Sequence, residues 1–260
     1  MYKTYAIINS RTLGSLKLDF QKMAASARAA LDRTILVSGA NRGIGLEVCR
    51  DALNYMSSKS LLFLGCRDLN AGKVACAKEL EADARVIPVQ LDISDEASIA
   101  SCLETVSQHL GESRRLDVLV NNAGILLQKD ENNEEYDHRL GEKTLSINFE
   151  GTVRLTSTFL PLLKRSREGV EGSMRAAVLA TSSGVGVRTL GMLREDHRLK
   201  LMDMDTLNLE VLRQTVREIM SELAEDQKSA YHDIPTVAYG ISKMALNCYT
   251  RILARDNAKM

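Results

Sequence analysis

The sequence predicts an α/β fold: a doubly wound parallel β-sheet with helices on both faces, in three layers. Short aliphatic strands alternate with helical segments between Thr34 and Ala180, an alternation that is typical of parallel sheets. A glycine-rich turn follows the first of these strands directly and opens a helix. With 260 residues the chain is long enough for one such domain.

The elements are predicted from runs of aliphatic and β-branched residues that are separated by turn residues. The strands are short and almost wholly apolar, as expected for a sheet that is buried on both faces. The predicted strands are 34–37, 61–64, 85–91, 116–120 and 175–180. The predicted helices are 46–54, 71–82, 95–110, 139–164, 205–226 and a last one around residue 239.

The composition argues against several classes of protein. Lys+Arg and Asp+Glu are equal at 34 each, so no net charge attracts nucleic acid or an anionic membrane. The longest apolar runs are far too short to span a bilayer. The five cysteines and four histidines are scattered without ligand spacing, which predicts neither a disulfide framework nor a metal site.

Residues 1–33 differ from the rest because six Lys or Arg side chains face only two Asp side chains, with Ser, Thr and Ala between them. Such a leader fits a poorly ordered extension or a mitochondrial presequence, and Asp19 argues against the presequence. We therefore predict a basic N-terminal extension before a domain at 34–260. The predicted location is cytoplasmic, with mitochondria as the alternative.

The segment Ser38–Gly45 reads Ser-Gly-Ala-Asn-Arg-Gly-Ile-Gly and joins the first strand to the first helix. Gly39, Gly43 and Gly45 let the backbone turn sharply and approach a ligand, and the helix N-terminus favours an anion. The spacing differs from Gly-x-Gly-x-x-Gly, and no Lys-Ser/Thr follows as in a P-loop. The prediction is a phosphate cradle. The alternative is a tight turn without a ligand.

The second strand is followed by Arg67 and Asp68. In dinucleotide sites an acidic residue at this position binds the ribose hydroxyls, whereas an arginine accommodates a 2′-phosphate. Arg67, together with Arg42 in the glycine-rich turn, favours NADPH over NADH. Asp68 points the other way, and both arginines could also be solvated surface charges.

Two later strand ends carry further candidates for cofactor binding. Asp92 and Ile93 follow the third strand, at the edge where open parallel sheets bind ligands. Asp92 could accept a hydrogen bond from an adenine amino group, or it could be the N-cap of the next helix. Asn122 follows the fourth strand in Asn-Asn-Ala-Gly, where an amide can bond the sheet backbone and small residues leave room for a cofactor.

The second half of the chain holds the candidates for chemistry. Ser183 follows the fifth strand at the same predicted edge. Tyr239 and Lys243 are four residues apart in a predicted helix, where an ammonium can stabilise a phenolate. Taken alone, this pair also fits an amphipathic helix with a surface lysine. Asn148 lies inside a predicted helix, where an exposed side chain is its commonest explanation.

These motifs together resemble the short-chain dehydrogenase/reductase family, and within it the carbonyl reductases. They occur in the family's order, and Ser38 keeps the hydroxyl of the family's usual threonine. The subgroup is suggested by the 239 − 183 = 56 residues between serine and tyrosine, where carbonyl reductases carry an insertion, here about 184–234. The motifs are Ser38-Gly39-x-x-x-Gly43-Ile44-Gly45, Asn121-Asn122-Ala123-Gly124, Asn148, Ser183 with Gly186, and Tyr239-x-x-x-Lys243.

The resemblance implies NADPH-dependent reduction of aldehydes, ketones or quinones on a Rossmann-type domain. Tyr239 would donate the proton, with its pKa lowered by Lys243, which would also hold the nicotinamide ribose. Ser183 would bond the carbonyl oxygen, and Asn148 would hold a water. The implied cofactor contacts are Gly39, Asn41, Arg42, Gly43, Ile44, Gly45, Arg67, Asp92, Ile93, Asn122, Tyr239 and Lys243.

The chain stops at Met260, 17 residues after Lys243, whereas relatives continue with further strands. We therefore expect a sheet that lacks the family's last strands and has one uncovered edge. The resemblance also implies a monomer, because the insertion helix covers the surface that other members use for tetramers. The alternative functions are an inactive nucleotide-binding or regulatory fragment and a scaffold that binds a partner through that helix.

Overall fold

The computed structural model describes residues 7–8, 32–112, 114–127, 138–164, 176–225 and 237–257. Most of the N-terminal extension and the end of the insertion lie outside the described residues, so the predictions for them stay predictions. The contacts divide the chain into two compact units. The first unit comprises Met1–Ala123 and Thr152–Thr181, and the second comprises Gly124–Gly151 and Ser182–Met260.

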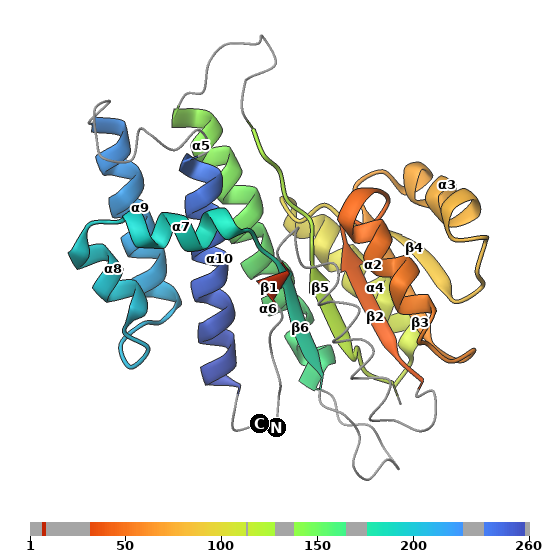
Figure 1. The fold of residues 1–260 in the computed structure, drawn as a ribbon. Helices are drawn as coiled ribbons and strands as arrows, with labels where there is room; N and C mark the ends of the chain where they lie inside the picture. The colour runs from red at the N-terminus through yellow and green to blue at the C-terminus, as the bar shows by residue number, and fades with distance from the viewer. Residues whose placement is uncertain are drawn as a thin grey trace. The chain divides into compact units, whose positions relative to one another are not determined.

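The first unit is built on a six-stranded parallel sheet with the order β1-β6-β5-β2-β3-β4 (Figure 1). The order reverses between β2 and β5, which is where open α/β sheets bind ligands. The strands are β1 (Ile7–Ile8), β2 (Thr34–Ser38), β3 (Leu61–Cys66), β4 (Val86–Gln90), β5 (Val118–Asn121) and β6 (Ala177–Thr181).

Helices cover both faces of this sheet, which confirms the predicted three-layer α/β class. Right-handed crossovers place α2 and α3 on one face and α4 on the other, and α6 packs against α4. The central strands are completely buried, as their uninterrupted apolar sequences predicted. The helices are α2 (Gly43–Leu53), α3 (Leu69–Glu79), α4 (Glu96–Leu110) and α6 (Thr152–Lys164).

The edge of the sheet beside β6 differs from our expectation. We expected it to be uncovered, but β1 runs parallel to β6, with Ile7 opposite Ala180 and Ile8 opposite Thr181. Two residues of the N-terminal extension therefore pair with the edge that the expected absence of further strands would leave open.

The second unit consists of helices gathered around α10, which contacts α5, η1, α7 and α9. Most of α10 is buried, including both Tyr249 and Lys243. The elements are α5 (His138–Leu145), the π-helix η1 (Ser146–Gly151), α7 (Gly184–Met192), α8 (Glu195–Met202), α9 (Leu209–Glu225) and α10 (Val237–Asp256).

The helix predicted at 139–164 is instead three elements, because η1 interrupts it between α5 and α6. The helices α7 and α8 were not predicted at all. The α8 helix has no apolar stripe, and two of its last carbonyls, those of Leu201 and Met202, accept hydrogen bonds from Arg251 of α10. A contact from 49 or 50 residues away is invisible to a reading of local periodicity.

Membrane-spanning helices and clustered metal ligands are both absent from the described residues. Among them, no helix is both long enough and apolar enough to cross a bilayer. In the same part of the chain, no three His, Cys, Asp or Glu side chains are grouped as metal ligands would be.

Candidate active site

The glycine-rich turn of the first unit has a backbone that only glycine adopts readily. Gly39 and Gly43 have φ angles of +64° and +59°, in the left-handed region that penalises a side chain. Gly45 has no space for a Cβ atom, which would collide with the carbonyl oxygen of Gly39. A Cβ at Gly43, by contrast, would meet no atom within 4 Å. The backbone therefore leaves no room for a side chain at Gly45, whereas the space beside Gly43 is open.

The same turn presents the N-terminus of α2. Arg42 is its N-cap residue but makes no side-chain capping bond, and the first turn of the helix contains no acidic residue. Uncapped N–H groups at the positive end of a helix attract an anion. Arg42 is exposed and Asn41 and Ile44 are half-buried. The turn therefore fits the phosphates of a dinucleotide.

Ser38 and Asn122 hold this turn to the end of β5. The Ser38 hydroxyl donates to the carbonyl of Val120 at 3.2 Å and accepts from the backbone N–H groups of Asn122 and Ala123, both at 3.0 Å. The Asn122 amide donates to the carbonyls of Ser38 and Gly39 at 3.0 Å and accepts from Thr181 at 3.1 Å. Asn122 thus shapes the cradle, and its effect on a cofactor would be indirect.

At the end of β3, the structure gives Arg67 and Asp68 different surroundings. Asp68 is the N-cap of α3, and its Oδ1 accepts hydrogen bonds from the backbone N–H groups of Asn70 at 2.8 Å and Ala71 at 3.2 Å. Arg67 is exposed directly beyond the strand. The residue that argued for NADH is therefore occupied with capping a helix.

Asp92 is not the N-cap of the helix that follows it, which was one of its two predicted roles. The cap of α4 is Asp95, whose side chain accepts from the Ala97 N–H at 3.0 Å. Asp92 instead closes a turn, accepting from the N–H and the hydroxyl of Ser94 at 2.9 and 2.6 Å. Ile93, beside it, is buried.

The four predicted catalytic residues all lie in the second unit. Ser183 is the N-cap of α7, and its side chain is hydrogen-bonded to that of Tyr239. Lys243 lies one turn beyond Tyr239 in α10, with its Nζ 5.5 Å from the centre of the tyrosine ring. That distance is within the range of a cation–π contact. Tyr239 and Lys243, which are four residues apart in the sequence, therefore lie side by side in the structure.

Burial acts on both ionisable groups of this pair. It raises the pKa of Tyr239, and the hydrogen bond with Ser183 opposes the rise. It also lowers the pKa of Lys243 to about 8, because an ammonium with 4% of its residue surface exposed loses hydration. The structure thus sets the pKa of the phenol above its usual value, whereas we predicted a lowered one.

Asn148 is buried, and does not have the exposed side chain that is usual for asparagine in a helix. Its Oδ1 accepts from the Ile125 N–H at 2.7 Å, and its Nδ2 donates to the Ile125 carbonyl at 2.8 Å and to the Ser242 hydroxyl at 3.1 Å. A Cβ atom on Gly124 would lie 3.1 Å from Asn148 Oδ1 and 3.6 Å from Lys243 Nζ. Asn148 thus fixes the loop beside the lysine.

Three buried or half-buried polar residues near the site were not predicted. Ser242 donates to the carbonyl of Tyr239 at 2.8 Å while it accepts from Asn148. Ser182 donates to Asn247 at 2.5 Å and so ties the segment before Ser183 to α10. Ser242 and Asn247 lie next to Lys243 and one turn beyond it, so helical periodicity could have indicated them.

The crossing of α7 and α10 depends on Gly186. A Cβ atom there would lie 2.7 Å from the backbone carbonyl carbon of Lys243. We expect Gly186→Ala to push α7 away and to separate Ser183 from Tyr239. The predicted result is a loss of stability of about 1–3 kcal/mol and a loss of kcat of about tenfold or more.

Gly191 provides the matched control, because it lies in the same helix with nothing within 4 Å of its added Cβ. Gly191→Ala should keep activity and gain up to about 1 kcal/mol from helix propensity. Urea unfolding and initial rates of both variants test this, and equal rates for the two would contradict it.

Comparison with known proteins identifies relatives along most of the chain. Residues 33–193 match the family model described as short chain dehydrogenase. (+)-Neomenthol dehydrogenase from Arabidopsis thaliana is 33% identical over 247 aligned residues that cover 86% of this chain and 78% of that protein. NADPH carbonyl reductase 3 from Mus musculus is 34% identical over 232, covering 88% and 76%.

Solved structures with a similar fold include two reductases. Salutaridine reductase from Papaver somniferum superposes with a TM-score of 0.72 at 26% identity, covering 87% of this chain and 83% of that one. An NADPH-bound carbonyl reductase from chicken fatty liver has a TM-score of 0.59 at 24% identity, over 89% and 73%. At that identity the likeness concerns the fold alone.

Proposed function

This chain belongs to the short chain dehydrogenase family of oxidoreductase enzymes, and we propose that it reduces aldehydes, ketones or quinones with NADPH. The observation that carries the proposal is the hydrogen-bonded Ser183–Tyr239 pair beneath a buried lysine. The name of the mouse relative supports both the carbonyl substrate and the cofactor.

The glycine-rich turn and the N-terminus of α2 would hold the phosphates, with Arg42 beside them. Arg67 would bind the 2′-phosphate by donating hydrogen bonds to it. Asp68 would not compete for this site, because its side chain caps α3. Asp92 and Ile93 would lie along the adenine. When bound, the cofactor supplies a hydride. All other steps belong to side chains of this chain.

Tyr239 would act as the general acid. Its raised pKa keeps the phenol protonated at neutral pH, which is the form that donates. An alkoxide is a far stronger base than a phenolate, so it takes the proton readily in spite of that raised value. Ser183 would donate a hydrogen bond from its hydroxyl to the carbonyl oxygen and so stabilise the negative charge that develops there.

Lys243 would work as a cation, since a pKa of about 8 leaves most of it protonated at pH 7. Its ammonium over the ring would stabilise the phenolate left after proton transfer and would also hold the nicotinamide ribose. Asn148 would hold the Gly124–Ile125 loop next to that ammonium, and a water beside it would return protons from solvent.

The test of this function is the oxidation of NADPH by the purified full chain in the presence of a simple quinone or an aromatic aldehyde. The proposal expects turnover that depends on both the carbonyl compound and Tyr239. A folded protein that binds NADPH but is as inactive as its Tyr239→Phe variant would favour the alternative, an inactive nucleotide-binding protein. The monomeric state and cytoplasmic location stay predictions.

Arg67 allows a separate test of cofactor choice. Arg67→Asp removes the cation that would face the 2′-phosphate and adds a repelling charge. The ratio of kcat/KM for NADPH over NADH should fall by about 100-fold, because a charge-assisted bond is worth about 1.5–3 kcal/mol. Arg114→Asp serves as the control, because Arg114 is a half-buried arginine that precedes β5, donates to the Lys59 carbonyl at 3.0 Å and has no assigned role in cofactor binding. An unchanged ratio in Arg67→Asp would remove Arg67 from this role.

A further inference from the structure

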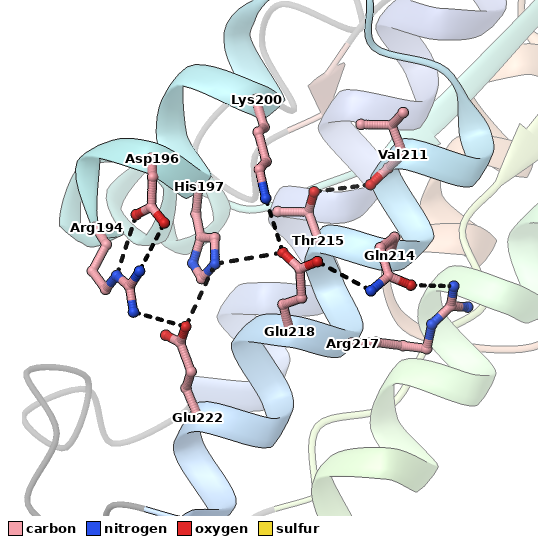
Figure 2. Close-up of polar contacts among 10 residues, drawn as sticks. All are labelled: Arg194, Asp196, His197, Lys200, Val211, Gln214, Thr215, Arg217, Glu218 and Glu222. Carbon is pink, nitrogen blue, oxygen red and sulfur yellow. Dashed lines mark hydrogen bonds and ion pairs between the residues drawn. The ribbon is translucent and has the colours of Figure 1, made fainter.

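Within the insertion, charged side chains join the helices α8 and α9 (Figure 2). Glu218 of α9 accepts from Lys200 of α8 at 3.1 Å, and Glu222 accepts from Arg194, just before α8, at 2.9 Å. The buried ring of His197 lies between both carboxylates, with Nε2 3.8 and 3.6 Å from them. These contacts link the two helices side by side.

A second face of α9 is apolar and is buried. The residues at helical spacing along it are almost inaccessible, and α9 contacts α10, the helix that carries Tyr239 and Lys243. These residues are Leu212, Val216, Ile219 and Met220. The α9 helix therefore packs against α10 through its apolar face and is joined to α8 by ion pairs.

From the border of this apolar face, Arg213 reaches the π-helix η1. Its guanidinium forms a bidentate pair with Glu150, with Nη2 2.6 Å from Oε2 and Nε 3.0 Å from Oε1. The two side chains are 31% and 29% exposed, so solvent screens the pair only in part. Two parallel bonds to a planar carboxylate fix orientation as well as distance.

Glu150 lies two residues after Asn148 in the same π-turn. Between them, Phe149 is buried and meets Tyr249 of α10 edge-on, with ring centres 6.5 Å apart. A π-turn is rare and intrinsically poor, so tertiary contacts must hold it in place. In η1 those contacts include the Asn148 bonds, the Phe149 packing and the Arg213–Glu150 pair.

We propose that Arg213 is a positioning residue, which fixes the π-turn through Glu150 and thereby sets the place of Asn148 beside Lys243. The inference rests on the proposed reaction and assigns the insertion helix a part in it. The α9 helix would then influence the catalytic residues through the Arg213–Glu150 pair.

The test compares Arg213→Gln with Arg217→Gln. Arg217 lies one turn further along α9 and pairs only within that helix in the described structure, with Glu210 at 3.2 Å and Gln214 at 2.9 Å. We expect Arg213→Gln to lower kcat about tenfold with little change in KM, and Arg217→Gln to keep kcat. Urea unfolding first shows whether the two variants have the same free energy of unfolding.

A double-mutant cycle distinguishes the pair from its separate members. Glu150→Gln should lower kcat as much as Arg213→Gln, and the double variant should be no worse than either, because both remove the same link. The exchanged pair, Arg213→Glu with Glu150→Arg, should recover part of kcat. Additive losses, or a kcat of Arg213→Gln equal to wild type, would overturn the proposal.

Amide hydrogen exchange separates this inference from the reaction itself. Exchange of the Ser146–Gly151 amides should quicken about tenfold or more in Arg213→Gln and stay unchanged in Arg217→Gln. If wild type reduces no carbonyl compound yet shows this difference, the proposed function fails and the link stands. If wild type is active and neither exchange nor kcat responds to Arg213→Gln, the link fails alone.

Discussion

Replacing Tyr239 by phenylalanine should lower kcat by about 100- to 10,000-fold and leave the KM for NADPH near that of wild type. The change removes one oxygen, the atom that is hydrogen-bonded to Ser183 and would deliver the proton. A loss confined to kcat identifies an interaction made in the transition state. Initial rates with a quinone, at saturating NADPH, measure it.

Tyr55→Phe is the matched control for this substitution. Tyr55 packs at the edge of the core of the first unit, outside the proposed machinery, so its variant should keep its rate. Urea unfolding of both variants shows whether a lost rate reflects lost folding. Equal rates for wild type and Tyr239→Phe would exclude the tyrosine as the acid.

Lys243→Met should change activity and stability in opposite directions. Activity should fall by about 100-fold or more, because the neutral side chain cannot stabilise a phenolate. Stability at pH 7 should rise by up to about 3 kcal/mol, since burial lowers the pKa of Lys243 from 10.5 to about 8 and each pKa unit corresponds to 1.36 kcal/mol. Functional sites commonly bear such a cost.

The gain from Lys243→Met should depend on pH with a definite sign. Below pH 8 the lysine is charged in both folded and unfolded wild type, so its burial penalty is fully present. Between about pH 8 and 10.5 only the unfolded chain holds the proton, so wild type gains stability as pH rises. Urea unfolding at pH 7 and pH 10 should show the difference shrink. A variant less stable than wild type at pH 7 contradicts it.

The sequence predicted those features that are written locally. The five strands from β2 to β6 follow from short apolar runs. The turn at Gly39–Gly45 follows from its glycines, of which Gly39 and Gly43 have positive φ angles and Gly45 has no space for a Cβ atom. The pairing of Tyr239 with Lys243 follows from helical period alone. Each of these features depends on residues that are close together in the sequence.

The features that sequence reasoning missed depend on contacts between distant residues. Asn148 contacts Ile125, 23 residues away, and Arg213 contacts Glu150, 63 residues away. The nearby sequence therefore predicts neither the π-helix nor the Arg213–Glu150 pair that holds it. The pKa of Tyr239 also depends on residues that are distant in the sequence. The spacing to Lys243 predicted a lowered value, but burial by the surrounding helices raises it.

The most direct test of the account follows the hydride itself. NADPH carrying deuterium at the transferable C4 position is mixed with the purified full chain and a prochiral ketone, and the alcohol is analysed by mass spectrometry. The account predicts one deuterium on the carbinol carbon, formed by wild type and nearly absent with Tyr239→Phe. An unlabelled alcohol, or none at all from a folded protein that binds NADPH, would contradict it.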